Sequence, residues 1–310
     1  MKTIHIVHNP TAGSGNHSKE ELIQLVERSG YRAEYISTDN IFWNKQLKTE
    51  DADAILLAGG DGTVKKLAKT LIEKKHSPSQ IPIHIMPLGT ANNISKELNI
   101  AQDKEQHEIN LDGRTTRFSY GKIKSTEKKD FFLESFGFGI FPKLISEMKK
   151  KDSPDDPEKK LKQTLEVLLE IVKKYKPKKG KIKTSGFEIK GKFLLVEVMN
   201  IKLIGPNFAL APNAHPADDH FDLVLIPKEK REELETYIIK LLKNEARKED
   251  LEKIVTVLPV QKVNLNWSGS RLHIDDNLIS DYLGRKYEIQ LAPEYFKFFT
   301  DVPNESNQHQ

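Results

Sequence analysis

The 310-residue sequence contains no cysteine, which excludes disulfide bonds, thiolate catalysis and metal sites with sulfur ligands. It also lacks a long hydrophobic run. The longest apolar stretch, residues 165–172, is interrupted by Glu166 and Glu170, so we expect neither a membrane-spanning helix nor a secretory signal. The histidines show no spacing typical of a zinc site. These absences favour a cytoplasmic protein.

Positive and negative charges are nearly balanced along the chain. The formal net charge is +4 and the sequence pI is about 8.8. This falls well short of the concentrated basic surface of a nucleic-acid-binding domain, and we expect no nucleic-acid partner. The mild positive charge does suit anionic ligands and lipid surfaces. At roughly 150 residues per domain, the length indicates two domains.

The first part of the chain alternates short apolar segments with amphipathic helical patterns. The strand-like segments are residues 3–8, 31–37, 54–58 and 81–86. This alternation is typical of βαβ units, whose parallel strands bring ligand-binding loops to one edge of the sheet. We predict an α/β nucleotide-binding domain with a parallel sheet over residues 1–114.

From about residue 115 the pattern changes to closely spaced strands separated by turn signals. The strand-like segments are residues 131–138, 193–199, 221–226, 255–257, 263–267, 271–274 and 287–291. We predict a mostly antiparallel β-sandwich over residues 115–292, interrupted by helices near residues 158–175 and 231–245. Residues 304–310 are expected to form a disordered tail.

Three polar, glycine-containing loops follow predicted strands of the first domain. They read Asn9-Pro10-Thr11-Ala12-Gly13-Ser14-Gly15, Gly59-Gly60-Asp61-Gly62-Thr63 and Pro87-Leu88-Gly89-Thr90-Ala91-Asn92-Asn93. Glycine admits positive φ and lets a phosphate approach backbone N–H groups, and a helix that begins after the loop directs its positive end at the ligand. Three such loops at one sheet edge predict a phosphate-binding site.

The three loops, in this order and spacing, resemble those of the diacylglycerol kinase-like lipid kinase family, which includes bacterial diacylglycerol kinases and sphingosine kinases. Ala211-Pro212 with Asp219 and Asp222 is similar to the metal-associated segment of that family. His273-Ile274-Asp275 is similar to the start of its Asp-Gly-Glu motif. The resemblance spans nearly the whole chain. It implies an ATP-binding domain completed by residues 293–303 and a β-sandwich domain for the lipid acceptor.

The resemblance and the chemistry of phosphoryl transfer together assign roles to the loop residues. The expected nucleotide-binding residues are Asn9, Pro10, Gly13, Gly15, Thr38, Gly59, Gly60, Asp61, Gly62, Thr63, Lys65, Gly89, Thr90 and Asn92. The Asp61 carboxylate is suited to hold Mg²⁺ or to accept the hydroxyl proton of the acceptor. The alternative is that Asp61 only caps the following helix. Lys65 either reaches the phosphates or lies on a solvated helix face.

Acids that the family pattern contains are missing from this chain. The Asp-Gly-Glu motif reads Asp275-Asp276-Asn277, and asparagine cannot act as a proton acceptor. Lys66 and Asn93 replace two further acids. Asp61, Asp275 and Asp276 are therefore the candidates for the catalytic base.

The resemblance also implies a structural metal held by backbone carbonyl groups. By position these belong to Pro216, Asp219 and Phe221. His220 stands where the family has glycine, and acids that flank a strand are often turn residues. Both interpretations remain open at this point.

Two features point to a membrane surface. An apolar helical stripe runs through residues 161–175, and residues 173–181 are strongly basic. A basic segment can hold a protein at an anionic leaflet, but most such stripes pack within their own domain. We expect a lipid substrate at the inner face of the membrane, and a homodimer is left open.

These observations predict an ATP- and Mg²⁺-dependent lipid kinase that transfers the γ-phosphoryl group to a lipid hydroxyl, with diacylglycerol as the first candidate. Two alternatives are a nucleotide or lipid sensor without turnover, favoured by Asn277, and a kinase of a soluble substrate similar to NAD kinases, which share the Gly-Gly-Asp-Gly loop.

Overall fold

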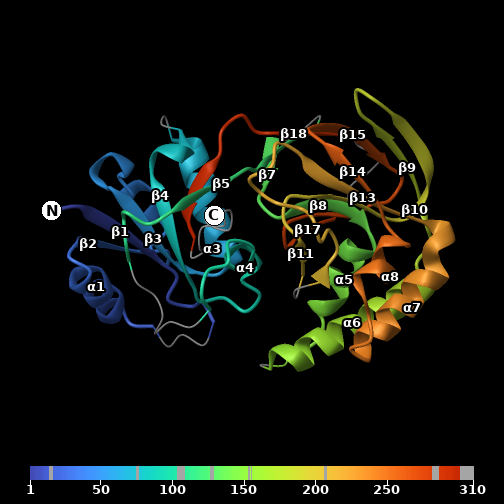
Figure 1. Cartoon of the computed structure of the whole chain (residues 1–310), viewed down its shortest axis with the longest axis horizontal. Coiled ribbons are helices and arrows are strands. Elements are labelled where there is room, and N and C mark those ends of the chain that lie inside the picture. Colours follow the sequence, from blue (N-terminus) through green and yellow to red (C-terminus); the bar gives the residue numbers. More distant parts are fainter. Residues whose placement is uncertain are drawn as a thin grey trace, which may run out of the picture. The chain divides into compact units, whose positions relative to one another are not determined.

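A computed structural model of the protein describes residues 1–13, 17–74, 77–102, 109–125, 129–152, 154, 156–205, 208–280 and 286–300. The chain forms two compact units (Figure 1). Unit 1 comprises Met1–Phe118 and Pro293–Gln310, and unit 2 comprises Ser119–Ala292. The tail expected to be disordered, residues 304–310, lies outside the described residues, as does Gly15.

Unit 1 contains a six-stranded sheet with the strand order β2-β1-β3-β4-β19-β5. All neighbouring strands are parallel except the antiparallel pair of β19 and β5. The strands are β1 (Thr3–His8), β2 (Arg32–Ser37), β3 (Ala54–Gly59), β4 (Pro82–Pro87), β5 (Thr115–Phe118) and β19 (Phe296–Phe299). The helices are α1 (Lys19–Arg28), α2 (Trp43–Gln46), α3 (Asp61–Glu73) and α4 (Asn93–Glu97), with short 3₁₀ turns at Thr49–Asp51 and Pro78–Gln80.

Local sequence signals explain these elements. Helix α1 begins with a capping box, in which the Ser18 hydroxyl accepts from the Glu21 N–H and the Glu21 carboxylate accepts from the Ser18 N–H. Helix α3 buries a stripe of apolar residues: Val64, Leu67, Ala68 and Leu71. Strand β3 is buried along its whole length. The sheet is therefore covered by helices, and its strand ends carry the polar loops.

Unit 2 is built on an eleven-stranded sheet in which all pairs are antiparallel. The main path runs β17-β16-β8-β10-β9-β15-β18-β6-β7, and β13 links β10 to β14. The strands are β6 (Gly121–Lys124), β7 (Lys129–Phe132), β8 (Ser135–Gly139), β9 (Lys178–Lys183), β10 (Glu188–Met199), β13 (Phe221–Pro227), β14 (Thr256–Val260), β15 (Lys262–Trp267), β16 (Leu272–Ile274), β17 (Asn277–Ile279) and β18 (Lys286–Leu291). A separate small sheet pairs β11 (Leu203–Ile204) with β12 (Phe208–Ala209).

The described part of unit 2 also contains the α-helices α5 (Ile140–Met148), α6 (Pro157–Lys174), α7 (Arg231–Leu242) and α8 (Lys248–Glu252), with a short 3₁₀ turn at Lys228–Lys230. The apolar stripe of α6 does not face solvent, because Leu165, Leu168 and Val172 are buried in a core shared with β10. These three side chains therefore pack within their own domain, as one of the two interpretations of the stripe expected. Among the described residues, no helix is both long enough and apolar enough to cross a membrane.

A buried ion pair lies inside unit 2. Nε2 of His273 on β16 is 2.9 Å from Oε1 of Glu197 on β10, and both side chains are almost fully buried. Burial raises the pKa of Glu197. Burial lowers the pKa of His273, but the charge and hydrogen bond of Glu197 outweigh it, so the pKa is raised overall. Gly137 makes room for the pair, because a Cβ there would lie 1.9 Å from Glu197.

We expect Glu197→Ala to lower the free energy of unfolding by about 3–5 kcal/mol, because it leaves His273 buried without its charged partner. Urea unfolding of unit 2 in the full chain measures this change. Glu188→Ala on the same strand is the matched control, and its exposed ion pairs contribute at most about 1 kcal/mol. If both substitutions lowered the free energy of unfolding equally, the claim that the buried pair stabilises the protein would be contradicted.

The same pair predicts a pH dependence of stability. A histidine whose pKa is raised by folding stabilises the protein fully below about pH 6.5, and this contribution disappears as the pH rises through the raised pKa. The raised pKa of Glu197 acts in the same direction. The contribution of this pair to the unfolding free energy should therefore fall between pH 5 and 9, and the difference between wild type and Glu197→Gln measures it. Burial lowers the pKa values of His5 and His8, which act in the opposite direction in unit 1 and are common to both proteins.

Candidate active site

Three loops gather at one edge of the unit 1 sheet. Because β1, β3 and β4 are adjacent and parallel, the segments that follow them begin at the same edge. We refer to residues 9–13 as loop 1, residues 59–63 as loop 2 and residues 88–93 as loop 3. The grouping that the sequence predicts is thus observed, and contacts between the loops define it further.

Asn9 joins loop 1 to loop 2. Its Nδ2 donates to the Thr63 Oγ1 at 3.2 Å, and its backbone N–H donates to the Ala58 carbonyl at 2.9 Å. Its Oδ1 accepts from the hydroxyl and the N–H of Thr11 at 2.9 and 3.3 Å. Asn9 therefore orients loop 1 against the first turn of α3.

The glycines of these loops serve two different purposes. Gly60 and Gly89 meet backbone to backbone, since a Cβ on Gly89 would lie 2.6 Å from the Gly60 Cα. Gly13 has a φ of +60°, and a Cβ there would lie 2.2 Å from the Leu88 carbonyl oxygen. Gly62 is exposed and a Cβ there would meet nothing within 4 Å. Loop packing therefore requires the first three glycines, whereas no described residue crowds Gly62.

The Asp61 carboxylate is buried and caps a helix. Its Oδ2 accepts from the Asn93 N–H at 2.9 Å, and its Oδ1 accepts from the Ile94 N–H at 3.1 Å. These N–H groups belong to the first turn of α4, where a negative charge is favourable. The alternative interpretation from the sequence was a cap on the following helix, α3. The structure instead shows Asp61 linking loop 2 to loop 3.

Lys96 is a loop neighbour that the sequence analysis did not identify. It lies on α4, and its Nζ donates to the Ala91 carbonyl at 2.7 Å. Burial lowers the pKa of Lys96, while the charge of Asp61 opposes this shift. Its position one helical turn after Asn92 is the signal that would have revealed it.

The remaining nucleotide-binding candidates lie at or near the same edge. The Thr38 N–H donates to the His8 carbonyl at 2.8 Å, at the end of β2. Asn92 is buried with a φ of +51°, and its Nδ2 donates to the Gly89 carbonyl at 2.9 Å. Pro10 and Lys65 are half-buried, and Thr90 is exposed on loop 3.

Asp275 belongs to unit 2, in the turn between β16 and β17. Its Oδ1 accepts from the N–H groups of Glu134, Leu133 and Ser135 at 2.8, 3.1 and 3.2 Å. Asp275 therefore holds the segment between β7 and β8 in place. Asp276 is exposed in the same turn, and Asn277, the first residue of β17, is exposed as well.

The carbonyl groups expected to hold a structural metal lie before and at the start of β13. The Pro216 carbonyl accepts from the Ser119 N–H at 2.7 Å. Asp219 is exposed, and Phe221 faces Val260 in the register of β13 and β14. Within the described ranges, no three histidine or acidic side chains are grouped so as to hold a metal. A metal at the three carbonyls stays a prediction.

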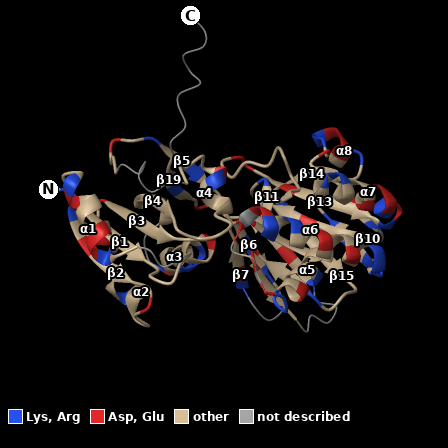
Figure 2. Cartoon of the chain, turned by 90° about the horizontal axis from the view of Figure 1, so that it is seen from below, with Lys and Arg blue, Asp and Glu red and all other residues tan. Residues whose placement is uncertain are grey.

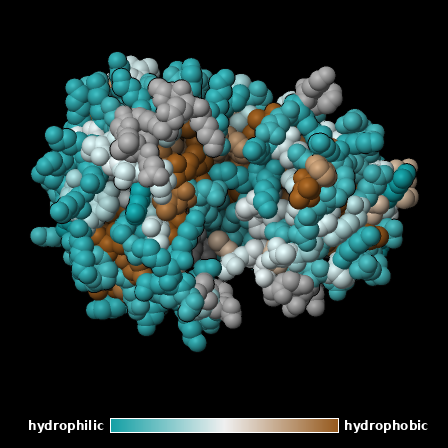
Figure 3. Space-filling model, turned by 180° about the vertical axis from the view of Figure 1, so that it is seen from behind, coloured by the Kyte–Doolittle hydropathy of each residue, from teal (hydrophilic) through white to brown (hydrophobic). Residues whose placement is uncertain are grey.

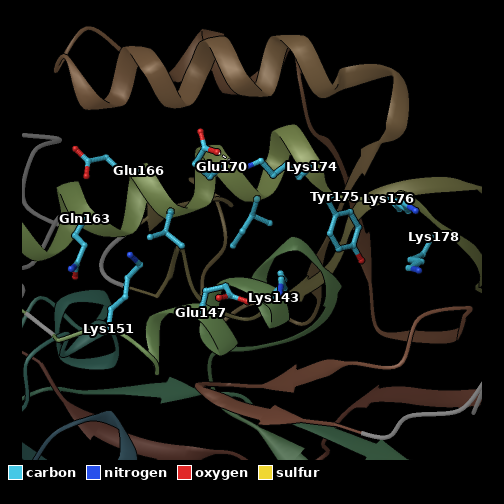
Figure 4. A pocket seen from close by; sticks show the side chains of 12 residues that line it. Lys143, Glu147, Lys151, Gln163, Glu166, Glu170, Lys174, Tyr175, Lys176 and Lys178 are labelled. Carbon is cyan, nitrogen blue, oxygen red and sulfur yellow. Dashed lines mark hydrogen bonds and ion pairs between the residues drawn. The ribbon is translucent and has the colours of Figure 1, made fainter.

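A hollow of about 660 Å³ opens between α5 and α6 in unit 2 (Figure 4). Val167, Ile171 and Tyr175 line it, and burial raises the pKa of Tyr175 to about 12. Charged side chains of both helices also line it, among them Lys143 and Glu147, which pair with each other. The hollow is therefore amphiphilic.

Fold and site together define an α/β domain suited to binding a phosphate-bearing nucleotide, followed by an antiparallel β domain. Residues 3–123 match the family model described as diacylglycerol kinase catalytic domain. Residues 152–277 match the one described as YegS C-terminal NAD kinase beta sandwich-like domain. The chain therefore contains a segment similar to the diacylglycerol kinase catalytic domain, followed by one similar to the C-terminal domain of YegS.

Individual relatives agree with this assignment. The chain is 24% identical over 238 residues to a diacylglycerol kinase of Bacillus subtilis (strain 168), across 74% of this chain and 75% of the relative. It is 28% identical over 132 residues to a diacylglycerol kinase of Staphylococcus aureus (strain MRSA252), across 40% of this chain and 41% of the relative.

Solved structures share the fold. A diacylglycerol kinase from Bacillus anthracis str. Sterne aligns with a TM-score of 0.68 at 17% identity, covering 97% of both chains. Yeast NADH kinase complexed with NADH aligns with a TM-score of 0.55 at 12% identity, covering 97% of this chain and 84% of that chain. The fold class predicted from the sequence is confirmed, and the resemblance to diacylglycerol kinases is borne out by both matched segments.

Substitution by alanine should have different effects at the crowded Gly60 and at the uncrowded Gly62. Gly60→Ala should destabilise the protein by about 1–3 kcal/mol, because its Cβ would lie 2.8 Å from the Gly89 Cα. Gly62→Ala should leave the melting temperature unchanged or higher, because alanine favours a helix, and should weaken ATP binding. Thermal unfolding and calorimetry with ATP measure both. Wild-type ATP affinity in Gly62→Ala would show that no phosphate approaches this position.

Asp61→Asn should reduce stability as well as activity. Asparagine would turn an NH₂ donor towards one of the two N–H groups that the carboxylate accepts, at a cost of about 1–3 kcal/mol. Kinase turnover should fall in parallel. Asp112→Asn, at an exposed surface ion pair, is the matched control. Unchanged unfolding of Asp61→Asn would refute the capping role.

Proposed function

We propose that this protein is an ATP-dependent lipid kinase that transfers the γ-phosphoryl group to the hydroxyl of diacylglycerol or a closely related lipid. The observation that carries the proposal is the interlocked set of three loops at one edge of the unit 1 sheet, all within the segment that matches the catalytic domain. Phosphoryl transfer depends mainly on positioning and charge stabilisation, which such a rigid set of backbone groups can supply.

The loops suit the triphosphate of ATP. Gly62 leaves open space at the first turn of α3, where N–H groups and the helix dipole favour an anion. Thr63 and Thr90 offer hydroxyl groups, and Lys96 brings a positive charge to loop 3. The remaining loop residues named in the sequence analysis are proposed to complete the nucleotide site.

The donor set near the loops fits magnesium only when the nucleotide supplies most of the ligands. Mg²⁺ prefers oxygen ligands and is commonly held by one or two carboxylates, by waters and by substrate phosphates. Asp61 is the carboxylate of loop 2, and its two oxygens already accept backbone N–H groups. When bound, Mg²⁺ would neutralise phosphate charge, and Asp61 would contact its water shell.

The proton acceptor is proposed to be a carboxylate of the β16–β17 turn or Asp61. Asp276 is exposed, whereas the Asp275 carboxylate is engaged by three backbone N–H groups. This contrast favours Asp276 as the group that moves a proton and Asp275 as the group that positions the turn.

Features of unit 2 support a lipid acceptor. Curated relatives bear the name diacylglycerol kinase, and the hollow between α5 and α6 combines apolar and charged side chains, as an amphiphile requires. Since diacylglycerol resides in bilayers, we propose that the protein works peripherally at the inner face of the membrane. A homodimer stays a prediction.

The direct test measures transfer of labelled γ-phosphate from ATP to diacylglycerol, sphingosine, NAD and glycerol by wild type and Asn277→Glu. We expect diacylglycerol to be the best acceptor. The exposed Asn277→Glu should change turnover less than tenfold, because a loose transition state demands little early deprotonation. A gain of about 10²–10⁴-fold would show that the chain lacks its general base. ATP binding without transfer to any acceptor would favour the alternative function, a nucleotide or lipid sensor without turnover.

A further inference from the structure

One face of the β9–β10 hairpin places lysines directly opposite one another. In the antiparallel register, Lys192 faces Lys179 and Lys190 faces Lys181. All four side chains are exposed, and alternate residues of a strand share a face. Like charges in directly opposed positions destabilise a sheet. The stability of the hairpin therefore does not explain this arrangement.

These four lysines belong to a hollow of about 680 Å³ that Lys228 also lines. We call the five lysines the lysine groove. Among the described residues, Glu229 is the only acidic one that lines the groove, and the remaining lining consists of Gly180, Gly191, Asn266 and Ser268. Helices α7 and α8 differ, since they carry charges of both signs (Figure 2). The groove is thus a local concentration of one charge in a nearly balanced chain.

Counter-ions within the protein compensate only part of this charge. Glu188 lies 3.2 Å from Lys181 and 2.8 Å from Lys190, and Lys228 lies 3.6 Å from Glu229. In the part of the chain that the structure describes, no ion pair reaches Lys179 or Lys192. The opposed lysine pair farthest from the hairpin turn, Lys179 and Lys192, therefore presents two uncompensated ammonium groups to an external anion.

The chemistry of the lining distinguishes between external anions. Single-stranded nucleic acid is bound largely by stacking on aromatic rings, and the groove lining contains none. It also lacks the large apolar side chains that a protein partner would bury. On the face shown in Figure 3, hydrophobic residues form patches within a mainly hydrophilic surface. Two opposed rows of lysine ammonium groups can instead pair with several phosphate groups at once, as on the surface of an anionic bilayer.

We propose that the lysine groove docks unit 2 on the anionic headgroups of the bilayer that holds the acceptor. This inference rests on the proposed lipid kinase function. Lys176 and Lys178 follow α6 and extend the basic surface towards the amphiphilic hollow (Figure 4). The basic segment at residues 173–181 suggested a membrane contact. The proposal assigns this contact to a sheet face, to which Lys190 and Lys192 contribute as much as Lys179 and Lys181.

The test measures binding of the full chain to phosphatidylglycerol–phosphatidylcholine vesicles and to pure phosphatidylcholine vesicles. Lys179→Gln/Lys192→Gln should weaken partitioning onto anionic vesicles roughly 10- to 30-fold, because each lysine near such a surface contributes a several-fold factor. Lys243→Gln/Lys253→Gln removes the same charge from exposed positions elsewhere in unit 2 and should change binding less than about threefold.

Two further readouts exclude a structural explanation. Removing an opposed like-charge pair should leave the melting temperature unchanged or higher. With diacylglycerol as acceptor, the ratio of activity on anionic vesicles to activity in neutral detergent micelles should fall about tenfold in the groove variant only.

Equal binding by the two double variants would overturn the proposal. The proposal would also be overturned if the wild type bound a single-stranded oligonucleotide but no vesicles, and if Lys179→Gln/Lys192→Gln abolished the oligonucleotide binding. If vesicle binding depends on the groove but no lipid is phosphorylated, the docking surface stands and the proposed kinase function fails. The two claims are therefore separable.

Discussion

The close approach of Gly60 and Gly89 is the constraint on which the rest of the site depends. Two backbones meet there with no room for a Cβ on either side. This approach brings α4 within reach of Asp61, whose carboxylate then satisfies two N–H groups of its first turn. Asn9 fixes loop 1 against Thr63 on the other flank. The three loops are joined by these contacts, so we expect a substitution in one loop to shift the backbone of the others.

In unit 2, buried polar side chains likewise fix the backbone next to a candidate catalytic residue. Asp275 gathers three backbone N–H groups around one carboxylate oxygen, and the neighbouring His273 pairs with Glu197 in the core. Nδ1 of His273 also lies 2.7 Å from the Asp275 carbonyl oxygen, which links the two arrangements. Buried polar groups thus hold the turn that exposes Asp276. In both units a buried carboxylate orders backbone that leads to an exposed candidate residue, Gly62 in unit 1 and Asp276 in unit 2.

Much of the fold and the existence of the site could be predicted from the sequence, because they depend on local patterns. Alternating apolar segments revealed the parallel strands, and the spacing of the loops revealed the family. What each residue does there depends on neighbours distant along the chain. The sequence predicts Gly60 as a phosphate contact, but it does not reveal that a Cβ there would lie 2.8 Å from the Gly89 Cα. Asp61 caps α4, some thirty residues away. The pairing of Lys179 with Lys192 follows from strand register, which a charge run does not reveal.

The central claim is that the three loops of unit 1 form one rigid phosphate-binding site. Amide hydrogen exchange resolved to single residues, with and without ATP and Mg²⁺, tests it most directly. The account predicts slower exchange on nucleotide binding at Gly62, Thr63 and Thr90, with little change at Asn93 and Ile94, whose N–H groups already donate to Asp61. Protection confined to unit 2, or no protection at the loops at saturating ATP, would contradict it.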